Sequence, residues 1–258
     1  MTGLVGDTAF VTGAAQGVGE AIARALVDAG VNRIAIAARR LDQLDRVASE
    51  LSDAGAHVVK CQLDLLDLAS VKKAAEFSSA ELGCIDILVN SAGVTSRGGL
   101  LDTTAETFDQ VFGTNVRGNF FLMQALARGM AAQKSGVIVN ISSMLAYGGM
   151  PHLLTYSASK AALNLITRNA AQSLRFDRVR VHAINLGWTV TPAEHEVQTR
   201  VHNMPEDWAE VEGERQPFGR LLVPQDPASL TVFLASRAAE MMTGNIIDLE
   251  QWVAGVTG

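Results

Sequence analysis

Cysteines and aromatic residues are scarce in this sequence. Of its 258 residues, 5% are aromatic and two are cysteines, Cys61 and Cys84, which stand in apolar surroundings without metal-like spacing. So few cysteines exclude a disulfide framework, and we expect both to be buried thiols in a reducing compartment. We therefore predict a cytoplasmic protein without a metal site.

Basic clusters and long apolar segments are also missing. The net charge is -6 and no run of Lys or Arg offsets it locally, which argues against a nucleic-acid surface. No apolar stretch approaches the roughly 20 residues that cross a bilayer. The N-terminal sequence MTGLVGDTAFVTG has no basic segment followed by an apolar one, so we expect no signal peptide. The expected partner is a small-molecule substrate, and neither nucleic acid nor membrane.

Short apolar, β-rich runs alternate with longer helical patterns along the chain. The helical patterns at residues 19–30 and 41–55 each end in glycine, which is typical of a helix C-terminus. Runs that are apolar on both faces suit a parallel sheet covered by helices on each side. The sequence predicts one α/β domain over residues 1–258, a doubly wound parallel sheet of the Rossmann type. The expected strands are residues 8–12, 33–38, 57–61, 85–90, 136–142, 179–185 and 245–249.

A glycine-rich turn follows the first expected strand. In TGAAQGVGEAIA the glycines are Gly13, Gly17 and Gly19, and a helix begins within the same stretch. Glycines let the backbone turn sharply and approach a phosphate, while the helix N-terminus supplies free N–H groups. Glycine also marks ordinary strand-to-helix turns. The position between strand and helix favours dinucleotide binding.

The end of the second expected strand bears on the choice of dinucleotide. Sites for NAD place Asp or Glu here, whereas sites for NADP use arginine for the 2′-phosphate. This chain has Ala38 followed by Arg39 and Arg40. Two guanidinium groups without a repelling carboxylate favour NADP(H) over NAD(H). The alternative is that both arginines are solvated loop residues.

Tyr156 and Lys160 lie four residues apart in TYSASKAALNL, which reads as helix. Residues at this spacing lie one above the other on a helix face. The pair is either a surface contact or a phenol whose pKa a neighbouring positive charge lowers, so that it exchanges protons near neutral pH.

At this point the sequence resembles the short-chain dehydrogenase/reductase family, over essentially the whole chain. Four motifs occur in the family's order and spacing, which makes chance agreement negligible. They are the T-G-x3-G-x-G turn from Thr12 to Gly19, NSAG from Asn90 to Gly93, Asn115 in TNVRGNFF, and Ser143 thirteen residues before the Tyr156-x3-Lys160 pair.

The resemblance implies an NAD(P)-dependent oxidoreductase that acts on CH–OH groups, with catalytic residues Asn115, Ser143, Tyr156 and Lys160. Lys160 would bind the nicotinamide ribose and lower the pKa of Tyr156. Tyr156 would then exchange a proton with the substrate oxygen, which Ser143 polarises. Asn115, in mid-helix, would hold a water that links Lys160 to solvent. A helix-interrupting polar role remains open for Asn115.

The same resemblance implies a set of cofactor-binding residues. Three of the assigned site residues keep a structural alternative: Ser143 could cap the strand end beside a better-placed Ser142, Asp64 could cap a helix, and Asn90 could hold the fourth strand in place. The set is Gly13, Gln16, Gly17, Val18, Gly19, Arg39, Arg40, Asp64, Leu65, Asn90, Ala92, Gly93, Tyr156, Lys160, Gly187, Thr189 and Thr191.

Two places depart from the family pattern. In NLGWTVT, Leu186 replaces a proline, so the turn before Gly187 is less rigidly preset. Trp188 packs either over the site or over the core. The C-terminal DLEQWVAGVTG lacks the usual glycine pair and carries Trp252, which predicts a different path for this end. The family's commonest state implies a homotetramer or homodimer, for which the alanine-rich face of residues 161–171 is suited.

Residues 190–225 form a polar, irregular insertion between the last two expected strands, and we expect a substrate lid there. So many polar side chains suit a sugar or polyol, although an exposed lid face is polar in any case. The main rival is a 3-oxoacyl thioester (acyl-carrier-protein) reductase, to which Arg117 and Arg128 could contribute a docking surface. Two non-enzyme alternatives are an NADP-sensing regulator on the same fold and a scaffold protein.

Overall fold

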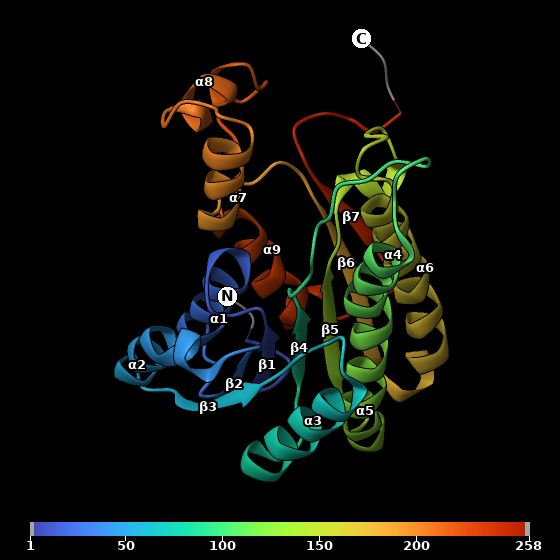
Figure 1. Cartoon of the computed structure of the whole chain (residues 1–258). Coiled ribbons are helices and arrows are strands. Elements are labelled where there is room, and N and C mark those ends of the chain that lie inside the picture. The colour runs from blue at the N-terminus through green and yellow to red at the C-terminus, as the bar shows by residue number, and fades with distance from the viewer. Residues whose placement is uncertain (1–2, 256–258) are drawn as a thin grey trace.

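Seven parallel strands form one sheet in the computed structural model, which describes residues 3–255 (Figure 1). Their order is β3-β2-β1-β4-β5-β6-β7, so the chain reverses its direction of winding between β1 and β4. All seven strands form within two residues of the predicted boundaries, which confirms the Rossmann-type fold. The strands are β1 Thr8–Thr12, β2 Arg33–Ala38, β3 His57–Gln62, β4 Ile87–Asn90, β5 Gly136–Ile141, β6 Val179–Leu186 and β7 Ile246–Leu249.

Helices cover both faces of the sheet. Helices α1, α2 and α9 pack on one face, while α3, α5 and α6 pack on the other, with α4 beside α6 (Figure 1). The helices are α1 Gly17–Asp28, α2 Asp45–Asp53, α3 Leu68–Leu82, α4 Ala105–Phe112, α5 Asn119–Gln133, α6 Leu154–Leu174, α7 Pro192–Glu196, α8 Trp208–Glu214 and α9 Gln225–Ala235.

Strand β1 lies at the centre of the core and is buried along its whole length. Its side chains alternate between the two faces of the sheet. Ala9 and Val11 pack with the cluster under α1, α2 and α9, and Phe10 packs with the cluster under α3 and α5. Burial on both faces explains why this strand is a continuous apolar run rather than an alternating pattern.

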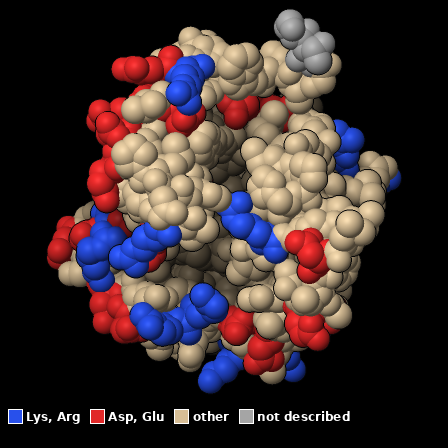
Figure 2. Space-filling model, turned by 45° about the horizontal axis from the view of Figure 1, so that its top comes forward, with Lys and Arg blue, Asp and Glu red and all other residues tan. Residues whose placement is uncertain are grey.

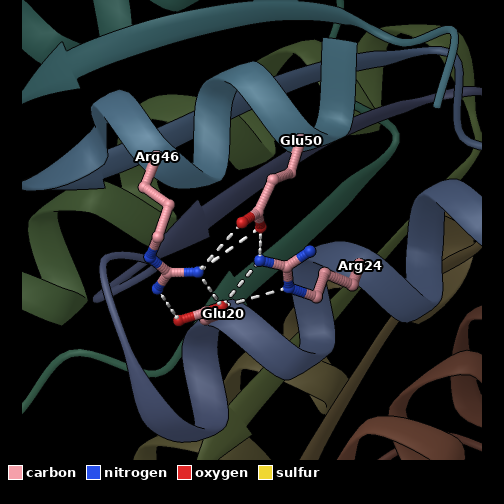
Figure 3. Close-up of polar contacts among 4 residues, drawn as sticks. All are labelled: Glu20, Arg24, Arg46 and Glu50. Carbon is pink, nitrogen blue, oxygen red and sulfur yellow. Dashed lines mark hydrogen bonds and ion pairs between the residues drawn. The ribbon is translucent and has the colours of Figure 1, made fainter. Parts of the chain in front are cut away.

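A charged network joins α1 to α2 on the surface of the first face (Figure 3). Glu20 accepts hydrogen bonds from Arg24 at 2.7 Å and from Arg46 at 2.7 Å, and Glu50 contacts both arginines. The Glu20 carboxylate is 17% exposed, and the Arg46 guanidinium lowers its pKa. The network therefore fixes α2 against the helix that opens at the glycine-rich turn.

The insertion at residues 190–225 is helical, which corrects the prediction that it is irregular. It contains α7, a π-helical turn at Val197–Val201, α8 and the start of α9, and α7 and α8 rise above the end of the sheet (Figure 1). Thr191 caps α7 by accepting a 3.1 Å hydrogen bond from the Glu194 N–H, and Pro192 occupies the first helical position. The prediction relied on the polar composition of the segment, which does not reveal helices as short as α7 and α8.

Trp188 packs over the core, which is one of the two predicted alternatives. Its ring stacks on the fully buried Trp208 of α8, with ring centroids 5.4 Å apart, and its own side chain stays partly exposed. This contact ties the end of β6 to the middle of the insertion.

Within residues 3–255, no helix is both long enough and apolar enough to cross a membrane. Both cysteines are free thiols, and burial raises the pKa of Cys61 to about 12.

Candidate active site

The glycine-rich turn after β1 borders a cavity of about 450 Å³ at the carboxyl ends of the strands. Figure 2 shows a hollow on this side of the molecule, with Lys and Arg side chains gathered beside it. Gly13 and Gly17 adopt positive φ angles of 67° and 60°, which glycine tolerates best. A Cβ at Gly19 would lie 2.3 Å from the Gly13 carbonyl oxygen. The turn therefore requires its glycines for conformation and for close packing.

The N-terminus of α1 points its free amides at this cavity. Its N-cap residue, Gln16, makes no side-chain cap hydrogen bond, so the first-turn N–H groups remain available to a ligand. Helix N-termini carry partial positive charge and bind phosphate groups. Together with the bare glycine backbone, this end of the cavity fits a pyrophosphate.

Most of the predicted cofactor residues border the same cavity, although they come from five different parts of the chain. The predicted residues that line it are Gly13, Gln16, Gly17, Val18, Gly19, Arg39, Asp64, Leu65, Ala92, Gly93 and Thr191. The predicted residues outside its lining are Arg40, Asn90, Tyr156, Lys160, Gly187 and Thr189.

The two arginines after β2 differ in their surroundings. Arg39 lines the cavity beside the glycine-rich turn. Arg40 lies outside the cavity, with its Nε 3.5 Å from an oxygen of Asp42. Of the two predicted arginines, Arg39 therefore borders the cavity and Arg40 does not.

Asp64 and Asn90 were each given a cofactor-binding role and a structural alternative, and their surroundings differ. Asp64 lines the cavity and accepts a hydrogen bond from the Leu66 N–H at 2.9 Å, whereas the cap of α3 is Asp67. Asn90 is buried, and its amide donates to Asn140 on the neighbouring strand at 2.8 Å. Asn90 therefore joins β4 to β5, as its structural alternative predicted.

Tyr156 and Lys160 share one face of α6, as their spacing predicted. The Lys160 Nζ lies 5.6 Å from the centroid of the Tyr156 ring and donates a 2.8 Å hydrogen bond to the carbonyl oxygen of Ile141 at the end of β5. Lys160 is 5% exposed. The strand end thus fixes the lysine, and the lysine lies over the phenol.

The pKa of Tyr156 is raised in the folded chain, whereas the prediction was a lowered pKa. Burial is the largest cause, because it disfavours the phenolate, and the negative charge of Glu194 adds to it. Hydrogen bonds with Ser143 and Thr95 oppose the increase. Burial also lowers the pKa of Lys160 to about 8, so this ammonium loses its proton more readily than an exposed one.

Ser143 faces the phenol, whereas Ser142 faces away from it. Ser143 neighbours the Tyr156 hydroxyl, whose pKa it lowers, and it also accepts from the Leu145 N–H at 3.1 Å, so it caps the strand end as its structural alternative predicted. Ser142 donates to the backbone carbonyl of Lys160 at 3.3 Å. Of the two serines, Ser143 is therefore the one placed to touch a substrate at Tyr156.

Asn115 sits in a π-helical turn, Gly113–Gly118, between α4 and α5, rather than in a regular helix. Its Oδ1 accepts from the Val94 N–H at 2.8 Å, and its amide donates to the Val94 carbonyl at 2.9 Å and to Ser159 at 3.0 Å. The side chain is therefore fully engaged in joining the loop after β4 to α6. Such π-turns occur frequently at functional sites.

The segment after β6 keeps an ordered turn despite Leu186. The Gly187 N–H donates to Leu249 of β7 at 3.0 Å, and the Thr189 hydroxyl donates to the Gly187 carbonyl at 3.0 Å. A Cβ at Gly187 would lie 2.1 Å from a carboxylate oxygen of Glu250. The bond to β7 therefore orders the backbone at Gly187, and the Glu250 carboxylate fills the space beside it.

Sequence reasoning missed several residues around the site. Thr95 hydrogen-bonds with Tyr156, and Gln43, Gln110 and Thr114 line the cavity. Gln110 and Thr114 are four residues apart, which places them on one helix face, and Thr114 directly precedes Asn115, so this pair was a usable signal. Thr95 comes from a loop and Gln43 from a short 3-10 helix, Leu41–Leu44, and the sequence offers no comparable pattern for either.

A Rossmann-type sheet, a glycine-rich turn at a cavity, and a Tyr–Lys pair beside it define a dinucleotide-dependent oxidoreductase. The family model for short chain dehydrogenase matches residues 7–202, and this chain belongs to that family. No group of three or more His, Cys, Asp or Glu residues suited to a metal ion occurs in the described part of the chain.

Similar proteins of this family include dehydrogenases and reductases that are named for an alcohol or a sugar. The chain is 33% identical over 243 residues to a cis-4-hydroxycyclohexanecarboxylate dehydrogenase from Sinomonas cyclohexanicum, covering 94% of each chain. It is 33% identical over 254 residues to a sorbitol dehydrogenase from Cereibacter sphaeroides, covering 96% of this chain and 97% of the other. The crystal structure of L-sorbose reductase from Gluconobacter frateurii, complexed with NADPH and L-sorbose, superposes with a TM-score of 0.92 at 26% identity, covering 99% of each chain.

Proposed function

We propose that this protein is an NADP(H)-dependent oxidoreductase that interconverts a carbonyl and a secondary alcohol of a sugar or polyol. The observation that carries the proposal is the placement of Tyr156 against Lys160 and Ser143, at the strand ends that also form the glycine-lined cavity. The whole chain would act as one oxidoreductase domain, with a lid at about residues 190–225.

The residues around the cavity fit a dinucleotide. Gly13, Gly17 and Gly19 leave the backbone bare, and the free amides of α1 would hold the pyrophosphate. Asp64 and Leu65 would border the adenine. A nicotinamide cofactor bound here supplies the hydride in reduction and accepts it in oxidation.

Arg39 supports NADP(H) over NAD(H). It is the guanidinium at the end of β2 that lines the cavity, and no carboxylate follows β2 directly. A guanidinium forms strong charge-assisted hydrogen bonds with phosphate. Arg39 would hold the 2′-phosphate, whereas Arg40 stays with Asp42.

Tyr156 would exchange the proton at the substrate oxygen. Because burial raises its pKa above the usual 10, the phenol keeps its proton at neutral pH. In reduction, the protonated hydroxyl donates this proton to the carbonyl oxygen as that oxygen gains negative charge. Ser143, which hydrogen-bonds with the same hydroxyl, would donate to the substrate oxygen and orient it.

Lys160 would hold positive charge beside the phenol. With a pKa of about 8, its ammonium is mostly protonated at neutral pH. That charge stabilises the phenolate left after proton donation. Asn115 would keep the loop after β4 and helix α6 in register, since it bonds to Val94 and Ser159.

A second copy of this chain would cover the outer side of α5 and α6. A groove of about 520 Å³ runs between these helices, and most of its lining is apolar or small. Small side chains let helices of two subunits approach closely. We propose that α5 and α6 form the subunit contact of a homodimer or homotetramer, which works in the cytoplasm with its cysteines as thiols. Lining residues include Phe120, Met123, Ala127, Ile166, Ala170 and Leu174.

Parallel titration with NADPH and NADH, followed by nicotinamide fluorescence, tests the cofactor, and turnover of ketoses, alditols and 3-oxoacyl thioesters tests the reaction. We expect tighter NADPH binding and turnover of sugars or polyols. Tighter NADH binding would contradict the role of Arg39. Exclusive turnover of thioesters would identify a 3-oxoacyl thioester reductase, and binding without any turnover would favour an NADP-sensing regulator.

A further inference from the structure

Glu194 occupies a particular position on the lid. It lies on the first turn of α7, directly after Ala193 and three residues after Thr191, and both of those residues line the cofactor cavity. Its N–H is held by the Thr191 hydroxyl at 3.1 Å. The turn that carries Glu194 therefore begins at the edge of the cavity and cannot swing away without losing its cap.

Two donors fix the Glu194 carboxylate through one of its oxygens. Trp188 Nε1 donates to Oε1 at 2.8 Å, and Gln198 Nε2 donates to the same atom at 2.7 Å. Within residues 3–255, no side chain or amide donates to Oε2. The carboxylate is thus held in place with one strong acceptor oxygen to spare.

The surroundings of Tyr156 make that spare oxygen significant. A Cβ at Gly93, which lines the same cavity, would lie 3.6 Å from the Lys160 Nζ, so the Tyr156–Lys160 pair adjoins the cavity at whose edge α7 begins. The negative charge of Glu194 is the smallest of the influences on the pKa of Tyr156, and it acts to raise that pKa. A substrate bound between the Tyr156–Lys160 pair and α7 would therefore have the Glu194 carboxylate on its lid side.

We infer that Glu194 determines substrate specificity: its free carboxylate oxygen accepts a hydrogen bond from a hydroxyl group on a carbon near the reacting one. This inference rests on the proposed oxidoreductase function and narrows its substrate to neutral polyhydroxy compounds. A hydroxyl donor forms a short, charge-assisted bond with a carboxylate. A substrate carboxylate in the same position would instead be repelled.

A second lid carboxylate provides a matched control. Glu196 lies two residues further along α7, is exposed, and pairs with Arg200 at 2.7 Å. Since α7 turns by about 200° over two residues, Glu196 faces away from the side on which Glu194 lies. Replacing Glu196 by Gln removes the same charge from the same helix without touching the site.

The test compares wild type, Glu194→Gln and Glu196→Gln on three alcohols with saturating NADP⁺ and, in parallel, NAD⁺. The first alcohol is sorbitol. Gluconate differs from it by a carboxylate, and cyclohexanol has no second hydroxyl. Reduction is measured with the corresponding carbonyl compounds, fructose, 5-ketogluconate and cyclohexanone. Values of kcat/KM are taken from the pH plateau, because loss of the Glu194 charge also lowers the pKa of Tyr156. Glutamine keeps an acceptor for Trp188 and Gln198, so cofactor affinity and Tm serve as controls for the fold.

We expect Glu194→Gln to lower kcat/KM for sorbitol about tenfold, as for the loss of a charged hydrogen bond. The kcat/KM of this variant for cyclohexanol should change by less than about twofold, and its kcat/KM for gluconate should not decrease. The Glu196→Gln variant should have the wild-type kcat/KM for all three alcohols. Unchanged sorbitol activity, or an equal loss on all substrates, would overturn the inference. Wild-type activity on cyclohexanol without preference for sorbitol would overturn it while leaving the oxidoreductase function intact. No turnover of any compound would overturn both.

Discussion

The ammonium of Lys160 lies 5.6 Å from the centre of the Tyr156 ring, one helical turn further along α6. The same ammonium donates to the Ile141 carbonyl at the end of β5, so the strand end sets the position of the charge over the phenol. This relationship distinguishes Tyr156 from Tyr147, the other tyrosine of the chain, which is exposed and bonds to Asp248.

Replacing Tyr156 by Phe should abolish most turnover while cofactor affinity stays the same. The loss should reach about 10²- to 10⁴-fold in kcat, the usual range for removing a general acid. Steady-state rates and nicotinamide fluorescence measure the two quantities. Tyr147→Phe is the matched control and should retain full activity. Equal rates for wild type and Tyr156→Phe would exclude the phenol as the proton donor.

Replacing Arg39 by Ala should weaken NADPH binding about tenfold or more, because it removes a charge-assisted contact to the 2′-phosphate. NADH affinity should change little, since NADH lacks that phosphate. Arg40→Ala should change the affinity for NADPH less than Arg39→Ala does and should leave the affinity for NADH nearly unchanged, because Arg40 is outside the cavity and beside Asp42. If Arg40→Ala produced the larger loss, the assignment of the two arginines would have to be exchanged.

The free energy of unfolding should decrease as the pH falls from about 6.5 to about 4. His182 of β6 is fully buried, and burial and the neighbouring Arg180 lower its pKa from 6.5 to about 4. The unfolded chain therefore binds a proton in this range that the folded chain does not, and the decrease should reach at most about 3 kcal/mol. Chemical denaturation at several pH values measures it.

His182→Gln should flatten this pH dependence, because glutamine does not titrate and can still accept from Arg180, whose Nη1 lies 3.3 Å from the histidine ring nitrogen. His57→Gln, at an exposed position on β3, should keep the wild-type slope. Carboxylates with lowered pKa values, such as Glu20, lose their contribution only at pH values below 4.5. An unchanged slope in His182→Gln would assign the effect to other groups.

Replacing Glu20 by Gln should lower the free energy of unfolding by about 1 kcal/mol, because it breaks the network between α1 and α2 (Figure 3). The loss should shrink in high salt, which screens such pairs. Glu76→Gln removes an exposed i,i+4 partner of Lys72 and should cost less than about 0.5 kcal/mol. Urea unfolding at low and high salt compares the two variants.

Replacing Ala170 by Glu should reduce the size of the assembly, because it places a charge in the groove between α5 and α6. Light scattering coupled to size exclusion gives the mass in solution. Ala80→Glu, at an exposed position of α3, is the control. An unchanged mass in Ala170→Glu would place the subunit contact elsewhere.

The sequence alone determined the sheet and the residues of the site that follow a local pattern. The strands β1, β2, β4 and β5 are largely apolar runs bounded by turn or helix signals, so their positions follow from hydrophobicity and propensity. The strands β3 and β6 include polar residues but are rich in β-branched ones. The glycine-rich turn and the Tyr156–Lys160 pair are also local, because their meaning lies in a spacing of a few residues.

Tertiary structure decided whatever depends on contacts between distant segments. Arg39 and Arg40 are equivalent in sequence, and only the packing of β2 against the glycine-rich turn brings one of them to the cavity. The direction of the Tyr156 pKa shift is set by burial, which no spacing reveals. The position of the Glu194 carboxylate at the edge of the cavity depends on Trp188 and Gln198, which donate to it, and on Thr191, which caps α7. Electrostatic effects depend on distance and on the exclusion of water, and both are properties of the folded chain.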